Sequence, residues 1–221
     1  MTNLKTLSLS ENVITSLPEQ LANLQNLRVL DCRHNRLTEI PAVVYKLVSL
    51  TTLYMRFNRI REVDPELGNL VNLTNLSIRE NNISQLPGRI QARLRSCLFI
   101  SFSWNLANEM FSTCPNYLKL FCSGTIGALK SLVTCDCSYN QLEHLPAEIG
   151  QCSQLASLYL QHNKLEDLPP EIGQLTQLVQ LGLRYSQACR NPGLMESRIP
   201  ARRNICRQLW SYWQTNHADH C

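Results

Sequence analysis

The chain has 221 residues, a formal net charge of +4 and ten cysteines. This charge is too small to indicate nucleic-acid binding by itself, and no apolar run approaches the roughly 20 residues that a membrane-spanning helix needs. We therefore expect one elongated domain that neither binds nucleic acid nor inserts directly into a membrane.

A period of 23 residues organises the chain up to residue 90. Units open at Leu4, Leu27, Leu50 and Leu73 and follow L-x-x-L-x-L-x-x-N-x-[LI]-x-x-[LIV]-P-x-x-[LIV]-x-x-L-x-x. This pattern matches the signature of a leucine-rich repeat. Residues 1–90 are therefore predicted to hold repeats 1–4 of an α/β repeat fold. We expect a leucine-rich-repeat solenoid, with a curved parallel sheet on the concave side and short helical or extended turns on the convex side.

Each position that recurs in every repeat has a structural role. The L-x-L segment alternates with period two, so its leucines point to one face of a short strand and the residues between them to the other. Proline fixes φ and starts the return segment. We expect the asparagine of each unit to be buried and to bind backbone groups of the turn. These residues are Asn12, Asn35, Asn58, Asn81, Asn140 and Asn163.

A block of 36 residues, Gln91–Ile126, interrupts the period. Removing it joins P-G-R-I to G-A-L-K-S-L, which aligns with P-A-E-I-G-Q-C-S-Q-L at 146–155. One interpretation is a loop on the convex side, because insertions in such arrays map to loops. The other, which we favour, is translated non-coding sequence such as a retained intron. Transcript reads across the Ile90–Gly127 junction distinguish the two.

Repeats resume over residues 127–185, with unit leucines at Leu132, Leu155 and Leu178. The last unit is incomplete, because Ser186 stands where asparagine belongs. Residues 186–221 form a divergent tail, which is either a capping helix around 202–214 or a frame-shifted or mis-spliced end. Because the first unit also lacks a cap, we expect a fragment of a longer array.

The cysteines do not form a disulfide framework. Cys32, Cys135 and Cys137 replace core leucines and Cys152 replaces a convex apolar residue, so we expect four small buried thiols. No cysteine-paired cap and no secretory signal precede the first repeat. We therefore expect a reducing, cytoplasmic setting.

Three columns of residues are predicted to face solvent from the strands of the concave sheet. The first column reads Ser10, Arg33, Arg56, Arg79, Ser138, Gln161 and Arg184. The second column reads Glu11, His34, Phe57, Glu80, Tyr139, His162 and Tyr185. The third column reads Ser8, Asp31, Tyr54, Ser77, Asp136, Tyr159 and Gly182.

Three consecutive arginines, Arg33, Arg56 and Arg79, form what we call the arginine strip. Like charges on neighbouring strands destabilise a sheet, so something should offset their repulsion. One interpretation is compensation within the face by Asp31 and Glu80.

The other interpretation is a strip that binds carboxylates of a protein partner, flanked by the aromatic residues Tyr54 and Phe57. Arginine and aromatic residues dominate the hot spots of protein interfaces. The candidate partner-binding residues of the concave face are Asp31, Arg33, His34, Tyr54, Arg56, Phe57, Arg79, Glu80, Tyr139, Tyr159, Gln161, His162 and Arg184.

The sequence offers no arrangement typical of an enzyme. It contains no Ser/His/Asp set, no phosphate-binding loop and no ligand spacing typical of zinc. We therefore expect no catalytic residues, no cofactor and no metal site.

Several stretches resemble consecutive repeats of the Shoc-two/Sur-eight family, the leucine-rich-repeat scaffold of the Ras–RAF pathway. They include L-R-V-L-D-C-R-H-N-R-L-T-E-I-P, S-L-T-T-L-Y-M-R-F-N-R-I and Y-N-Q-L-E-H-L-P-A-E-I-G. The resemblance extends to L-S-I-R-E-N, L-Q-H-N and L-G-L-R-Y, covering residues 2–90 and 127–185. It covers neither the insert nor the tail.

The resemblance implies a non-catalytic scaffold that bridges the GTP form of a Ras-type GTPase and the catalytic subunit of type-1 serine/threonine phosphatase. That assembly acts indirectly on RAF kinase by removing an inhibitory phosphate, and it promotes MAP-kinase signalling. The expected location is cytoplasmic, and a nuclear location or recruitment to the membrane through the GTPase are the further alternatives. Residues matching family positions for partner contact or sensitivity to substitution are Asp31, Arg33, Arg56, Arg79, Gln161 and His162.

Two departures from the family bear on this expectation. The lysine-rich N-terminal segment with its phosphatase-docking motif is absent, and the family array is longer on both sides. An interruption between the fourth and fifth units would also splay the concave face unless it loops out cleanly. The alternative is a generic intracellular leucine-rich-repeat adaptor with another protein partner, and a third possibility is the ectodomain of a receptor.

Overall fold

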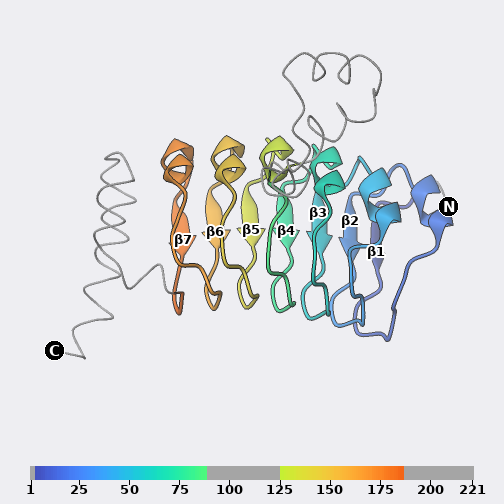
Figure 1. Ribbon diagram of the computed structural model, residues 1–221. Coiled ribbons are helices and arrows are strands. Elements are labelled where there is room, and N and C mark those ends of the chain that lie inside the picture. The colour runs from blue at the N-terminus through green and yellow to red at the C-terminus, as the bar shows by residue number, and fades with distance from the viewer. Residues whose placement is uncertain (1–2, 89–124, 187–221) are drawn as a thin grey trace, which may run out of the picture.

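A single sheet of seven parallel strands organises the structure, a computed structural model that describes residues 3–88 and 125–186. Each strand pairs with the next along the chain, in the order β1-β2-β3-β4-β5-β6-β7. Short 3-10 helices connect successive strands and line one edge of the array (Figure 1). The predicted curved solenoid with helical return segments is confirmed.

The regular elements recur once in each repeat. The strands are β1 (Thr6–Ser8), β2 (Val29–Asp31), β3 (Thr52–Tyr54), β4 (Asn75–Ser77), β5 (Thr134–Asp136), β6 (Ser157–Tyr159) and β7 (Gln180–Gly182). The 3-10 helices are η1 (Glu19–Asn23), η2 (Ala42–Lys46), η3 (Pro65–Asn69), η4 (Ile126–Ala128), η5 (Ala147–Gln151) and η6 (Pro170–Gln174). Proline begins most of the return segments as predicted, since Pro18, Pro41, Pro146 and Pro169 precede their helices in extended conformations.

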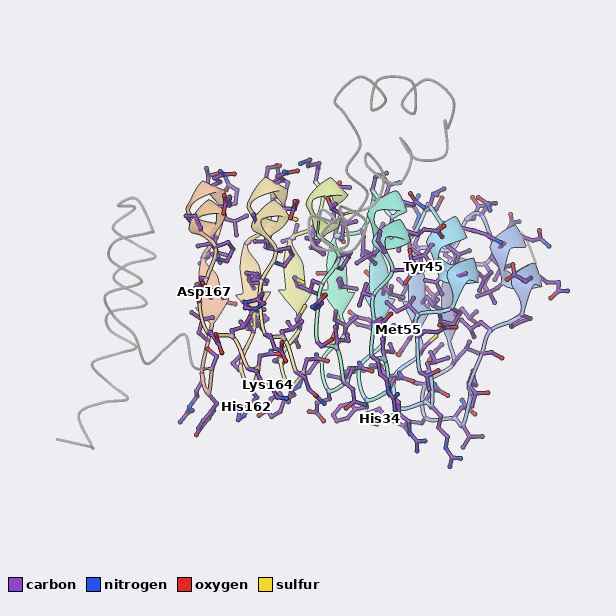
Figure 2. The ribbon with its side chains drawn as sticks, in the orientation of Figure 1. His34, Tyr45, Met55, His162, Lys164 and Asp167 are labelled. Carbon is purple, nitrogen blue, oxygen red and sulfur yellow. The ribbon has the colours of Figure 1, made fainter. Side chains whose placement is uncertain are left out.

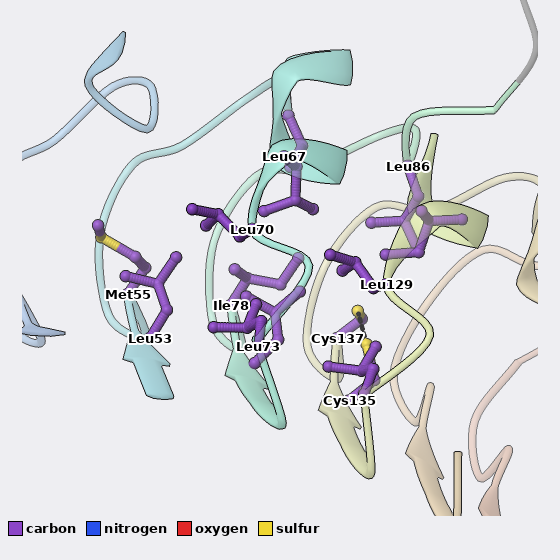
Figure 3. Packing of buried hydrophobic residues seen from close by; sticks show 14 of the residues in the cluster. Leu53, Met55, Leu67, Leu70, Leu73, Ile78, Leu86, Leu129, Cys135 and Cys137 are labelled. Carbon is purple, nitrogen blue, oxygen red and sulfur yellow. Dashed lines mark hydrogen bonds between the residues drawn. The ribbon is translucent and has the colours of Figure 1, made fainter. Parts of the chain in front are cut away.

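The leucine ladder forms one continuous core. Neighbouring strands pair with a shift of one period, so Leu30 lies opposite Leu53 and Leu53 opposite Leu76. These side chains are fully buried together with apolar residues of the return segments (Figure 3). Parallel strands that share one register stack identical positions on each other, and the apolar face that one unit exposes is buried by the next.

The sheet remains continuous across the insertion. Leu76 of β4 pairs with Cys135 of β5, although 58 residues lie between them in the sequence. The N–H of Ile126 donates to the carbonyl of Pro87 at 2.9 Å, the same bond that Ile149 makes to Pro146. The concave face is therefore not splayed at this point.

The insertion boundary moves by one residue relative to the sequence alignment. Ile126, which the alignment assigns to the insert, is fully buried in η4 at the position that Ile149 occupies in the next repeat. Removing residues 90–125 or 91–126 leaves the same sequence, because Ile90 and Ile126 are both isoleucine. Only the structure shows which of the two equivalent cuts matches the core.

Two of the three predicted columns do not lie on strands, and this prediction is wrong. Strand β2 ends at Asp31, so Arg33 and His34 belong to the turn after it. All seven residues of the second column have φ between 52° and 59°, a left-handed conformation that ends a strand. Hydrogen bonds between successive turns nevertheless continue, for example from His34 N–H to the Arg56 carbonyl at 3.1 Å. The columns therefore stay in register beyond the sheet.

The asparagine ladder has the predicted structural role from repeat 2 onwards. The prediction of a buried amide is wrong for Asn12, which is exposed in the first repeat and donates to the carbonyls of Leu9 and Ser10 in its own turn. The Asn58 amide donates to the carbonyls of Cys32, at 2.9 Å, and Met55, at 3.0 Å, and its Oδ1 accepts from Leu37 N–H at 3.0 Å. Asn35, Asn81 and Asn163 repeat this arrangement in their own turns. Ser186 is buried in the last turn and keeps one equivalent bond, to the Leu183 carbonyl at 2.9 Å. The repeat geometry thus reaches one residue into the predicted tail.

The core cysteines behave as small apolar residues. Cys32, Cys135, Cys137 and Cys152 are buried free thiols, as predicted. Burial raises the pKa of Cys32 and of Cys152 to about 12. Because the thiolate is the reactive form, these groups are protected from oxidation and alkylation in the folded state.

The predicted insert up to residue 124, the tail beyond Ser186 and the capping helix around 202–214 lie outside the described residues. Over residues 3–88 and 125–186, no helix has the length and apolar character to cross a membrane. The same residues contain no group of three histidine, cysteine or acidic side chains placed to hold a metal ion.

Candidate interaction surface

The candidate residues lie at the edge of the solenoid where the strands end. Figure 2 shows His34 and His162 along this edge, opposite the edge that carries the 3-10 helices. The last residues of their strands are Asp31, Tyr54 and Tyr159, and the other candidates lie in the turns, two or three residues after the end of their strand. Because the turns are held in register by the buried asparagines, side chains from distant repeats form continuous rows.

Two arginines of the strip are neutralised within the face. Arg33 makes a forked contact with Asp31, with Nε at 2.8 and 2.9 Å from its two carboxylate oxygens. Arg79 donates to Glu80 Oε1 from Nη2 at 3.0 Å and from Nε at 3.2 Å. The structure therefore supplies the compensation that the first interpretation of the strip requires, but only at these two positions.

Arg56, between them, has no such partner. Among the described residues no carboxylate lies within ion-pair distance of it, and its Nε is buried without a hydrogen-bond partner. Its guanidinium lies 5.8 Å from the centroid of the Phe57 ring. Because Arg56 has no ion pair with the described residues, it is the position of the strip where a carboxylate of a partner would add a new charge-assisted contact.

The second column forms two aromatic stacks. The His34 and Phe57 rings lie 4.2 Å apart with an interplanar angle of 14°. His162 lies between Tyr139, at 4.1 Å, and Tyr185, at 4.4 Å. A non-glycine residue with left-handed φ is disfavoured by about 1–2 kcal/mol, and stacking of about 0.5–1.5 kcal/mol per pair offsets part of that.

Glu80 lies between the two stacks in the second column and pairs with Arg79 of the arginine strip. Its partner Arg79 lies 4.6 Å from the centroid of Tyr139, and Arg184 lies 5.1 Å from that of Tyr185. Guanidinium groups thus lie over the aromatic rings at both ends of the second stack, where cation–π attraction is favourable.

The C-terminal half of the face is polar rather than cationic. The Tyr159 hydroxyl and the Ser157 hydroxyl both contact Gln180 Oε1. Gln161 lies against Gly182, where an added Cβ would be 2.6 Å from the Gln161 amide carbon. The strip is interrupted in repeat 5, because Ser138 occupies the arginine position and donates to Asp136 at 2.6 Å. The face therefore has a cationic half in repeats 2–4, whereas repeats 5–7 are rich in hydroxyl and amide groups and carry one arginine, Arg184, and one carboxylate, Asp136.

Sequence reasoning missed two features of this surface. Ser138 and Asp136 form a closed polar pair, which could have been found from the D-x-S spacing that matches D-x-R in repeat 2. Arg36 and Arg59, just beyond the turn, are exposed, and the repeated tetrapeptide R-[HF]-N-R was the available signal.

Asp31 gives the surface a testable pH dependence. Burial raises the pKa of Asp31, but hydrogen bonds and charge from Arg33, with a contribution from Arg56, outweigh it and leave that pKa below its ordinary value. A carboxyl group with a lowered folded-state pKa stabilises the fold above its unfolded pKa of about 3.9, and this contribution is lost as pH falls through the folded pKa.

Replacing Asp31 by asparagine should therefore lower the free energy of unfolding at pH 7 by about 1 kcal/mol or more. The difference from the parent protein should shrink below about pH 4, because the parent carboxyl group then becomes neutral too. Urea unfolding followed by circular dichroism between pH 3 and pH 7 measures both. A difference that stays constant over this range would show that packing, not charge, makes Asp31 stabilising.

Comparison with known families gives the same picture as the geometry. The family described as "Leucine-rich repeat region" matches residues 1–85, and "Leucine Rich Repeat" matches residues 154–175. The fold is a leucine-rich-repeat solenoid. Repeat arrays of this kind are typically non-catalytic interaction modules, which supports a protein-interaction scaffold.

Solved structures with the same fold include bacterial and receptor proteins. An internalin of Listeria monocytogenes is 26% identical, with 84% of this chain and 43% of that chain covered and a TM-score of 0.58. A leucine-rich-repeat protein of Leptospira interrogans is also 26% identical, covering 84% and 44%, with a TM-score of 0.54. A TDR receptor, at 23% identity, covers 84% and 27% with a TM-score of 0.61.

This chain spans less than half the length of those solved proteins. No match was found among curated proteins. The comparisons thus agree on the fold and on a binding role, while the partner has to be argued from the surface itself.

Proposed function

We propose that the leucine-rich-repeat solenoid is an intracellular scaffold that binds an acidic surface of another protein through the arginine strip. The observation that supports this most directly concerns Arg56: its neighbours Arg33 and Arg79 are each paired with a carboxylate, whereas Arg56 has no such partner among residues 3–88 and 125–186. A partner carboxylate at Arg56 completes the alternation of charge along the strip. The flanking rings of Tyr54 and Phe57 supply the aromatic contacts typical of interface hot spots.

The finer proposal concerns the partners. The resemblance of residues 2–90 and 127–185 to the Shoc-two/Sur-eight family favours a Ras-type GTPase in its GTP form and the type-1 serine/threonine phosphatase catalytic subunit. The scaffold then holds the two together, and the phosphatase acts on RAF kinase. The division of the face into a cationic half and a polar half is compatible with two partners of different surface chemistry.

A generic adaptor with another acidic partner is the second candidate. It rests on the same strip and differs only in which protein is bound. The receptor-ectodomain alternative is disfavoured by the buried, unpaired thiols of the core, because such domains are usually disulfide-bonded.

The test is a pull-down with the full chain and the GTP-loaded GTPase, compared with its GDP form. Replacing Arg56 by glutamate should reduce binding by at least about tenfold, because a favourable charged contact becomes a repulsive one. The matched control is Arg28→Glu, which makes the same charge change at the exposed position just before β2, away from the strip.

Three outcomes are informative. Loss with Arg56→Glu but not with Arg28→Glu supports the strip and the GTPase together. Equal loss with both variants would show only a net-charge effect and would remove the strip from the proposal. Absence of GTPase binding by the parent chain, in the full form and in the form lacking residues 90–125, would leave the generic adaptor as the remaining candidate.

A further inference from the structure

The turns of repeats 2 and 3 share a tetrapeptide that none of the functions above uses in full. It reads Arg33-His34-Asn35-Arg36 in repeat 2 and Arg56-Phe57-Asn58-Arg59 in repeat 3. In both turns the second residue has a left-handed φ, 53° and 57°, and the asparagine is buried. The turn therefore separates its two arginines: the first lies beside the concave face, and the second lies at the start of the return segment that leads to the next 3-10 helix.

Backbone hydrogen bonds hold the second arginine of each turn. Arg36 N–H donates to the Ile14 carbonyl at 2.9 Å, and Arg59 N–H donates to the Leu37 carbonyl at 2.8 Å. Their side chains are exposed. Because the two turns are in register, Arg36 and Arg59 occupy equivalent positions after the buried asparagines, and Arg33 and Arg56 occupy equivalent positions before the stacked residues His34 and Phe57.

Only one of these four guanidinium groups is neutralised. Arg33 is paired with Asp31, whereas Arg36, Arg56 and Arg59 have no carboxylate within ion-pair distance in the described part of the chain. Acidic groups on the neighbouring turns and return segments are Glu11, Glu39, Glu62 and Glu80. Glu80 pairs with Arg79, and the other three form no ion pair in the described part of the chain. The row of Arg36 and Arg59 ends on both sides, because Val13 and Asn82 occupy the equivalent positions in repeats 1 and 4, whereas the row of Arg33 and Arg56 continues to Arg79.

We infer that this edge, formed by Arg56 beside the Phe57 ring and by the exposed Arg36 and Arg59, binds a phosphorylated serine or threonine of a partner protein. A phosphate monoester carries about two negative charges and three acceptor oxygens, so it can neutralise several guanidinium groups at once. Arginine forks are suited to such an anion in geometry as well as in charge. A single carboxylate satisfies one of them and leaves the others unpaired.

This inference rests on the proposed function only in so far as the ligand belongs to a partner protein. The probe is a fluorescein-labelled peptide, Gly-Ser-Gly-phosphoSer-Gly-Ser-Gly, titrated with the full chain in low salt and followed by fluorescence anisotropy. Its counterparts carry serine or glutamate at the phosphorylated position. We expect the phosphopeptide to bind at least about fivefold more tightly than the glutamate peptide, because it carries the larger charge.

The variant Arg36→Ala/Arg59→Ala should weaken phosphopeptide binding by at least about tenfold while leaving Arg33, Arg56 and Arg79 in place. Its matched control is Lys5→Ala/Arg28→Ala, which removes two exposed cations from adjacent repeats at the opposite ends of the strands. Equal weakening by both pairs, or equal affinity for the phosphorylated and glutamate peptides, overturns the inference. GTPase recovery by the Arg36→Ala/Arg59→Ala variant separates this result from the proposed function, which depends on Arg56.

Discussion

Replacing Asn81 by alanine is expected to lower the free energy of unfolding by about 3 kcal/mol or more, the sum of several lost buried hydrogen bonds. The Asn81 amide donates to the carbonyls of Met55, at 3.0 Å, and Ile78, at 2.9 Å, and Oδ1 accepts from Ile60 N–H at 3.0 Å. Alanine leaves these backbone groups buried without partners. The loss should therefore exceed that of a typical surface substitution by several-fold.

The measurement is equilibrium urea unfolding of the full chain at pH 7, followed by circular dichroism. Asn82→Ala is the matched control, because Asn82 is the exposed neighbour and should change stability by less than about 0.5 kcal/mol. If Asn81→Ala has an effect as small as the control, the ladder does not carry the stability that its geometry indicates.

A comparable effect is expected at the contact between the return segments of repeats 5 and 6. A Cβ at Gly150 in η5 would lie 2.4 Å from the backbone carbonyl oxygen of Glu171 and 2.8 Å from the Glu171 Cβ. Alanine at this position must separate η5 from η6, since backbone atoms cannot swing aside as a side chain can. We expect a loss of about 1–3 kcal/mol, the range typical of overpacked cores.

Gly182→Ala provides the contrast that isolates the cause. Its Cβ would also approach within 2.6 Å of another atom, but that atom belongs to the Gln161 side-chain amide. The amide can rotate away, so Gly182→Ala should have a clearly smaller effect than Gly150→Ala. The same urea unfolding measures both variants, and equal losses would mean that glycine flexibility rather than close contact decides the effect.

The sheet continues from β4 to β5 in spite of the insertion between repeats 4 and 5. Loop closure becomes more unfavourable only slowly with length, so a long segment that leaves and returns at neighbouring positions need not unfold the array. Here the bond between Ile126 and Pro87 and the bonds of Asn140 to Ile78 and Ile83 reconnect repeats 4 and 5. The arginine strip and the second aromatic stack consequently belong to one surface.

The candidate residues illustrate how far the pattern alone could reach. Their assignment to columns was possible because a fixed period of 23 puts Arg33, Arg56 and Arg79 at equivalent positions. Their local structure could not be predicted in the same way. Nothing in the L-x-L pattern shows that the strand ends after three residues and that the next side chains lie in a left-handed turn. The pairing of Arg79 with Glu80, beside it in sequence, also depends on that turn.

The sequence by itself determined the repeat fold, the buried roles of the leucines, asparagines and core cysteines, and the existence of an arginine row. These follow from periodicity, because stacked units must bury the same positions in every repeat. Only the tertiary structure decided that Ile126 fills the core of repeat 4, that Arg56 alone among the strip arginines lacks an ion pair with the described residues, and that the aromatic residues stack. Such features depend on distances between side chains of different repeats, which a one-dimensional period does not contain.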